Sequence, residues 1–122
     1  MSNGRTTPTV SDGNPDLQAM HCDLIALVRR LEESIDLAPD AAAIIAITEQ
    51  MAEVNARVTS TGRVLLARQT DEIAVHAKAV SDAIPAIEKE IDTLRDCERM
   101  VAGVAALLGT VDEAVRVARL AC

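Results

Sequence analysis

A heptad pattern of aliphatic residues runs along the second half of the chain and constrains its fold more than any other feature. From Ile73 the apolar positions recur at alternating steps of four and three residues as far as Leu108, and only Glu98 interrupts them. A 3.5-residue repeat keeps one apolar stripe of a helix against a neighbouring helix. The pattern predicts an all-α protein, built as an elongated helical hairpin or a coiled coil with a long C-terminal helix that reaches about residue 120.

The same stripe predicts an assembly surface. The chain has 122 residues and no Phe, Tyr or Trp, so its buried surface must be built from aliphatic and small side chains. At roughly 25 cal/mol per Å² of buried apolar area, a narrow seam stabilises an isolated chain only marginally, and burial against a partner is the natural remedy. We expect the partner interface to contain Ile73, Val80, Ile84, Ile87, Ile91, Leu94, Val101, Val104, Leu108, Val111 and Val115.

Turn and capping residues divide the chain into a tail and one domain. Residues 1–13 are polar and rich in turn formers, which predicts a disordered tail, and residues 14–122 are expected to form a single helical coiled-coil domain. Asn14 followed by Pro15 is a typical helix start, since Asn caps the helix and Pro is favoured in its first turn. The first helix is expected over about residues 15–37, because Pro39 biases Ala38 away from the helical region, and a second helix is expected to begin at Pro39.

Three positions along the predicted long helix interrupt its regularity. Around Gly62 the chain forms either a turn between two helices or a soft point in one continuous helix, and continuity is slightly favoured because no second breaker follows. Pro85 removes a helical hydrogen bond, so we expect a kink there rather than a new helix, because the stripe keeps its phase. Beyond Leu94 the apolar path moves sideways through Cys97 and avoids Glu98, which indicates local overwinding.

Charge and cysteine content exclude several classes of partner. The net charge of -7 and the pI of about 4.7 disfavour nucleic acid and anionic membrane surfaces, which both need clustered Lys and Arg. The apolar runs are too short for insertion into a membrane. Cys22, Cys97 and Cys122 are too few and too scattered for a disulfide framework, so a reducing, cytoplasmic location is expected.

The sequence predicts no catalytic residue, cofactor site or metal site, and no small-molecule substrate. Zinc sites are usually built on closely spaced pairs of ligands. His21 and Cys22 are adjacent, and His76 and Cys97 are isolated, so none of these residues has such spacing. A nucleophile and base also need a pocket to orient them, which narrow helices without aromatic residues rarely form. We therefore expect a protein that is not an enzyme.

One segment resembles a known family. Residues 89–101, Lys-Glu-Ile-Asp-Thr-Leu-Arg-Asp-Cys-Glu-Arg-Met-Val, resemble the C-terminal helix of small coiled-coil subunits of the biogenesis of lysosome-related organelles complex, most closely subunit one. The segment Ile84-Pro85-Ala86-Ile87 is more similar to subunit two, where a Pro also interrupts the run. The resemblance implies a cytoplasmic, coiled-coil subunit, peripheral on organelles, of a complex that positions endosomes and lysosomes. It carries over no catalytic residue.

These observations favour a non-enzymatic subunit of a hetero-oligomeric helical complex, whose partners are other helical coiled-coil proteins or further copies of the chain. The alternative is a bacterial secretion-linked helical hairpin with its turn at Gly62. That family has a Trp before the Gly of the turn, whereas this chain has Thr61 there. Native co-purification separates the two, because the first predicts small helical partners and the second predicts recovery from the culture medium.

Overall fold

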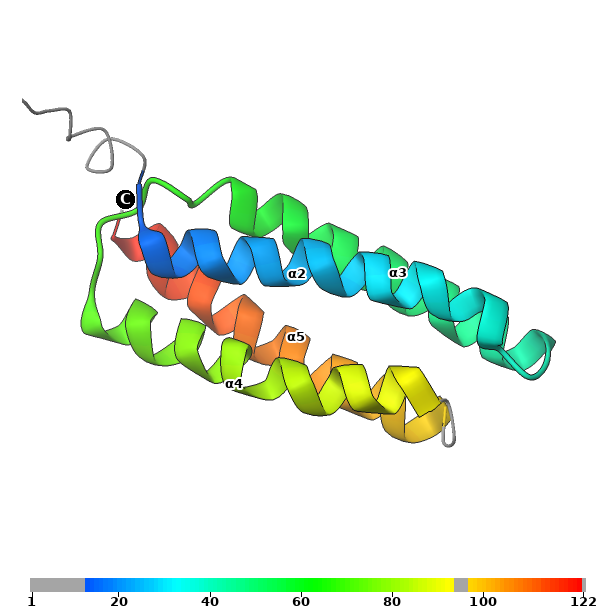
Figure 1. The fold of residues 1–122 in the computed structure, drawn as a ribbon. Helices are drawn as coiled ribbons and strands as arrows, with labels where there is room; N and C mark the ends of the chain where they lie inside the picture. Colours follow the sequence, from blue (N-terminus) through cyan, green and yellow to red (C-terminus); the bar gives the residue numbers. More distant parts are fainter. Residues whose placement is uncertain (1–12, 94–96, 122) are drawn as a thin grey trace, which may run out of the picture.

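The computed structural model describes residues 13–93 and 97–121, and in these ranges it contains four α-helices, one 3-10 helix and no strand (Figure 1). The prediction of an all-α protein is confirmed. The elements in chain order are α2 (Pro15–Ser34), η2 (Ile35–Leu37), α3 (Ala41–Gly62), α4 (Asp71–Thr93) and α5 (Cys97–Leu120).

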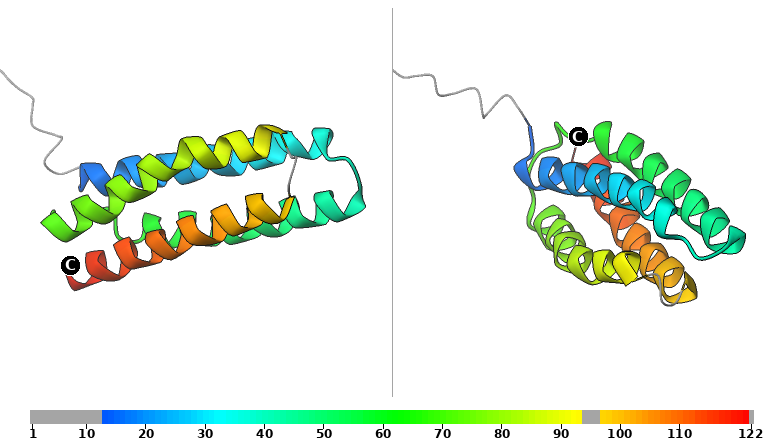
Figure 2. Two further views of the ribbon diagram at one scale, coloured as in Figure 1. Left: turned by 90° about the horizontal axis from the view of Figure 1, so that it is seen from below. Right: turned by 45° about the vertical axis from the view of Figure 1, so that its right-hand side comes forward.

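The helices pack as a bundle of two antiparallel hairpins. α2 and α3 form one hairpin and α4 and α5 the other, and the two hairpins meet through α2 against α4 and α3 against α5. The left-hand view of Figure 2 shows α2 and α4 as one layer and α3 and α5 as the other. We call the end where α2 turns into α3 the turn end, and the end where α2 begins and α5 finishes the open end.

Side-chain caps begin three of the helices. Asn14 accepts a hydrogen bond from the backbone N–H of Leu17 at 3.0 Å, and Asp40 does the same for Ala43 at 2.9 Å. These caps satisfy amide groups that have no partner inside the helix. The predicted start at Asn14 is therefore confirmed, and the start predicted at Pro39 lies two residues later, at Ala41 with Asp40 as its cap. At the start of α4 the hydroxyl of Thr70 accepts from the amide of Ile73 at 3.2 Å.

A single apolar core joins all four helices. Its fully buried large side chains come from one stripe of each helix, at steps of three and four residues. They are Leu17, Met20, Leu24, Leu27 and Leu31 on α2, Ile47 and Val54 on α3, Ile73, Val80 and Ile91 on α4, and Met100 and Val104 on α5. The core therefore consists of aliphatic residues and methionine.

The prediction of one long C-terminal helix is wrong. α4 ends at Thr93, and α5 begins at Cys97 and runs back beside α4 (Figure 1). The sideways shift of the apolar path around Cys97, interpreted as overwinding, marks the change from one helix to the next. Leu94 lies outside the described residues, as do residues 1–12 of the predicted tail.

The favoured continuous helix through Gly62 is also wrong. The chain does turn after Gly62, but the alternative, a three-helix chain with a hairpin there, is not found, because the described residues form four α-helices and α3 pairs with α2 and α5. α3 ends at Gly62, and an irregular connection leads to α4 at the open end. Thr70 followed by Asp71 and Glu72 supplies a cap and two acids, which is a helix start that the apolar pattern alone does not reveal. α4 does continue through Pro85, as expected.

Candidate interaction surface

The stripe expected to meet a partner lies inside the chain's own bundle. Eight of its residues are buried: Ile73, Val80, Ile87, Ile91, Val104, Leu108, Val111 and Val115. Ile84 and Val101 are half-buried against the same core, and Leu94 is not described. The structure therefore assigns the ten described side chains to the core of one chain and not to an exposed partner surface, because α5 packs beside α4 and the two parts of the stripe share one core.

A different surface is left without a neighbour, on the outer side of the layer formed by α3 and α5. Its residues recur at heptad spacing on both helices and are mostly small. We define this α3/α5 face by Ala42, Ala46, Glu49, Glu53, Ala56 and Ser60 on α3, and by Glu98, Ala102, Ala105, Gly109, Asp112 and Arg116 on α5. All are exposed except the half-buried Ala46 and Ser60. Heptad spacing of small residues suits close packing of another helix.

At the turn end, the α3/α5 face is hollowed into an open groove of about 600 Å³. Its floor and walls are mainly apolar, and two carboxylates stand among the lining residues. The groove is lined by Pro39, Asp40, Ala42, Ala43, Ala46, Cys97, Glu98, Val101 and Ala102. Because six of these are Ala, Val or Pro, the groove suits an aliphatic side chain better than a polar ligand.

The centre of the α3/α5 face contains a glycine that the fold itself does not require. Gly109 lies in the interior of α5, where a Gly is less favourable than Ala by roughly 1 kcal/mol. A Cβ atom added there would meet nothing within 4 Å, whereas one added at Gly103 would lie 3.6 Å from Ile87. The missing side chain at Gly109 therefore leaves room at the surface for the close approach of another backbone.

A charged cluster on the α3/α5 face ties α3 to α5. The Arg57 guanidinium donates to both oxygens of Asp112 at 3.1 Å and to Glu53 at 2.6 Å. The hydrogen bond to Asp112 is the largest cause that raises the pKa of Arg57 above its ordinary value, and burial opposes it. The cluster fixes the axial alignment of the two helices, with Arg57 beside Asp112, so that equivalent turns of α3 and α5 lie level.

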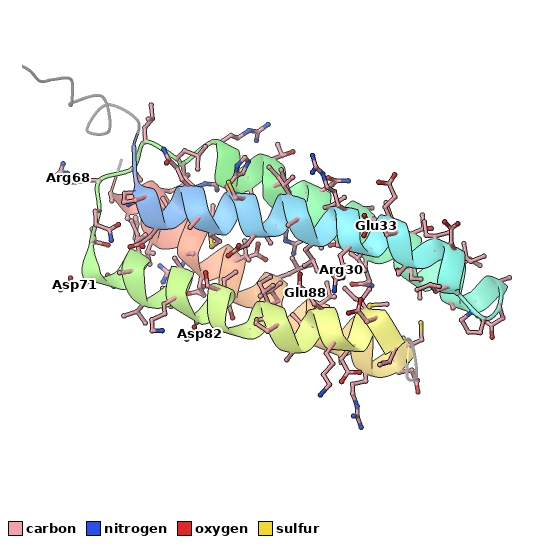
Figure 3. The ribbon with its side chains drawn as sticks, viewed as in Figure 1. Arg30, Glu33, Arg68, Asp71, Asp82 and Glu88 are labelled. Atoms are coloured by element: carbon pink, nitrogen blue, oxygen red, sulfur yellow. The ribbon has the colours of Figure 1, made fainter. Side chains whose placement is uncertain are left out.

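The opposite layer has a different character. Arg30 of α2 donates to both oxygens of Asp92 of α4, at 3.0 and 2.8 Å, and Ser81 donates to Asp23 at 3.0 Å. Figure 3 shows Arg30 and Glu88 where α2 faces α4. The hydrogen bond from Arg30 holds the pKa of Asp92 below its ordinary value. The hollow on this side is lined by charged side chains, Arg29, Arg30, Glu33 and Glu88 among them, whereas the groove between α3 and α5 is mainly apolar.

Residues that could support chemistry are dispersed. In the part of the chain that the structure describes, no three His, Cys, Asp or Glu side chains are grouped so as to hold a metal ion. His21 is close to Gly62 of α3, and Cys22 is exposed on α2. Cys97 is half-buried in the groove on α5. No helix among the described residues combines the length and apolar character that a membrane span needs.

The α3/α5 face was missed in the sequence because it is not strongly apolar. In α3 the signal was the row Ala42, Ala46, Glu49, Glu53, Ala56 and Ser60, in which small residues recur at heptad spacing. In α5 the corresponding signal was the second heptad set, which contains Ala102, Ala105 and Gly109.

Comparison of the chain with models of protein families, with curated proteins and with solved structures finds no match. Inference about function therefore rests on the geometry of the bundle.

Proposed function

We propose that this chain is a non-enzymatic helical interaction protein that binds another helical protein through the α3/α5 face. One observation carries the proposal: two parallel, level helices present heptad rows of small side chains without a neighbour. The opposite layer, α2 and α4, has charged side chains where α3 and α5 have the mainly apolar groove, and an ion pair joins its two helices. The proposed partner surface is therefore the outer rows of α3 and α5, and not the apolar stripe that was predicted from the sequence.

The segment that resembles subunits of the lysosome-related organelle complex is not one helix here. Residues 89–101 are shared between the end of α4 and the beginning of α5. A role in endosome or lysosome organisation remains a proposal that rests on this sequence resemblance. The secretion-linked alternative, which needs a hairpin at Gly62, gains no specific support. α3 ends at Gly62, but the two hairpins of the bundle are α2 with α3 and α4 with α5.

Co-purification with matched alanine variants tests the proposed function. Ala105, on the α3/α5 face, and Ala79, on α4, are both exposed alanines inside helices. Ala105→Arg inserts a long charged side chain into the surface, while Ala79→Arg makes the same change elsewhere. We expect parent and Ala79→Arg chains, tagged and purified from native cells, to retain the same helical partner, and Ala105→Arg to lose it.

Circular dichroism spectra and melting temperatures close to the parent's would show that both variants are folded. Partner retention by a folded Ala105→Arg chain would contradict the proposal, as would purification of the parent without any partner or second copy.

A further inference from the structure

An exposed leucine and an apolar groove lie at opposite ends of the α3/α5 face. Leu120, at the end of α5, is 77% exposed. The groove at the turn end includes Cys97, at the start of α5. Leu120 and Cys97 lie at nearly equal distances along α5 on either side of Gly109. A two-fold axis that crosses α5 at its middle, perpendicular to the helix, therefore places the leucine of one copy at the groove of a second copy.

We propose that the α3/α5 face binds a second copy of this chain in antiparallel orientation, with Gly109 at the crossing and Leu120 of each copy in the groove of the other. This inference rests on the proposed function and specifies its partner. Such an interface is isologous, since the same surface serves both copies. An exposed aliphatic side chain paired with an apolar pocket is the usual form of an interface anchor.

The distribution of charge decides between antiparallel and parallel docking. Within the described residues, Glu49 and Glu98 on the half nearer the turn end have no ion-pair partner, and the same is true of Arg63 and Arg119 nearer the open end. Arg119 lies one residue before Leu120, so antiparallel docking places it opposite Glu98 of the other copy. Parallel docking would instead place acidic halves together, which is repulsive.

The crossing point fits the same arrangement. Level with Gly109 the outer residues of α3 are Glu53 and Ala56, and the small Ala52 lies beside them. In an antiparallel dimer, α5 lies on α5 of the copy and α3 on α3. Helices approach closely where neither presents a large side chain. The carboxylate of Glu53 is held in the ion pair with Arg57, which also contacts Asp112.

A simpler cause exists for part of this charge pattern. An acid near the start of a helix and a base near its end both interact favourably with the helix dipole. Glu98 and Arg119 occupy those positions in α5. The interaction of these charges with the helix dipole affects the stability of the folded chain, whereas their pairing across an interface affects association between chains. The experiments therefore measure association directly and use variants in which the two roles predict different results.

Leu120→Ala tests the anchor, with Leu66→Ala as its matched control. Leu66 is 76% exposed but lies in the connection between α3 and α4. Sedimentation equilibrium of the purified full chain, from about 1 μM to 1 mM, should show a dimer. We expect Leu120→Ala to raise the dissociation constant by about tenfold or more, since an anchor is lost twice per dimer, and Leu66→Ala to leave it unchanged.

Charge reversal tests the orientation. Glu98→Arg and Arg119→Glu should each weaken self-association by about tenfold, because like charges then face each other at two places. Mixing the two variants restores opposite charges at both places, so the mixture should form a heterodimer at least as tight as the parent dimer. Asp71→Arg, in the first turn of α4, repeats the change at a helix start away from the face and should leave association unchanged.

Failure of this inference is distinguishable from failure of the proposed function. A parent chain that stays monomeric at 1 mM overturns the second copy as partner, and so does a dimer that neither Leu120→Ala nor the charge reversals weaken. If Ala105→Arg still abolishes capture of a different helical protein from native cells, the proposed function stands. A mixture of Glu98→Arg and Arg119→Glu chains that does not associate, although each is folded by circular dichroism, overturns the antiparallel geometry.

Discussion

At the scale of single residues, the start of α2 is fastened to the connection that follows α3. Asn14 is buried; its backbone N–H donates to the carbonyl of Leu65 at 2.7 Å, and its side-chain amide donates to Gln69. Gly13 precedes it with a φ of 99°, a conformation that L side chains rarely adopt. The turn of the chain at Gly13 therefore sets the position of the helix cap.

Gly13→Ala should destabilise the bundle by about 1–3 kcal/mol, because the strained conformation is forced on a residue with a Cβ. That Cβ would also collide with the carbonyl oxygen of Leu65. Urea unfolding followed by circular dichroism measures the change. Gly62→Ala is the control, since Gly62 is helical and its Cβ would find only His21, at 3.5 Å. That variant should gain about 0.4–1 kcal/mol, and equal losses in both variants would contradict this explanation.

The contact between Arg30 and Asp92 predicts a small acid-dependent contribution to stability. The pKa of Asp92 is lowered in the folded chain, mainly by the hydrogen bond from Arg30. A carboxyl whose pKa is lower in the folded chain stabilises the fold at pH values above its ordinary pKa, about 4. This contribution is lost as the pH falls through the lowered pKa of the folded chain. The melting temperature of Asp92→Asn should therefore lie below the parent's at pH 7 and approach it towards pH 2.

Asp36→Asn is the control for this pH profile. Asp36 is exposed in η2 and forms no ion pair within residues 13–93 and 97–121. The difference in melting temperature between Asp36→Asn and the parent should not become smaller as the pH falls from 7 towards 2. A constant gap between parent and Asp92→Asn from pH 7 to pH 2 would show that the carboxylate does not act through its ionised form.

At the scale of elements, the sequence predicts which residues are buried better than it predicts where helices end. The stripes through α2, α4 and α5 follow directly from aliphatic periodicity, and the cap at Asn14 from its position before Pro15. The turn between α4 and α5 was missed because its apolar phase shift is also compatible with one overwound helix. Periodicity is a property of each helix and contains no information on the direction in which the next one runs.

The outer face of α3 and α5 was missed for a related reason. Alanine and glycine contribute little to an apolar pattern, so heptad rows of small residues resemble an ordinary exposed face. Only the packing shows that Ala105 and Gly109 share one surface with Ala42 and Ala56, because it brings α3 and α5 together although α4 separates them in the chain.

Pro85→Ala should stabilise α4 and with it the bundle. Pro85 is exposed in the interior of the helix, where a proline costs up to about 3 kcal/mol relative to alanine. We expect a gain of about 1–3 kcal/mol in the free energy of unfolding. Pro15→Ala, in the first turn of α2, should bring no such gain, since proline is favoured there. A loss of stability in Pro85→Ala would mean that α4 needs its proline for packing.

At the scale of the whole molecule, the core is continuous from one hairpin to the other. Buried residues of α2 and α3 belong to the same cluster as those of α4 and α5. The two hairpins are further joined by Arg30 with Asp92 and by Arg57 with Asp112. Unfolding of either hairpin would expose the apolar surface of the other, so the four helices should unfold in one cooperative transition.

Ile91→Asp tests whether the heptad stripe of α4 serves the core or a partner. Ile91 is fully buried, so the substitution places a carboxylate among aliphatic side chains. The cost should exceed about 4 kcal/mol, most of the stability of a small domain, and we expect loss of the helical spectrum and of the cooperative transition. Neighbouring Glu90→Ala loses only a 3.9 Å ion pair with Arg99 and should change stability by less than about 1 kcal/mol. If Ile91→Asp instead stays folded and loses a partner, the stripe is an assembly surface after all, and the core assignment fails.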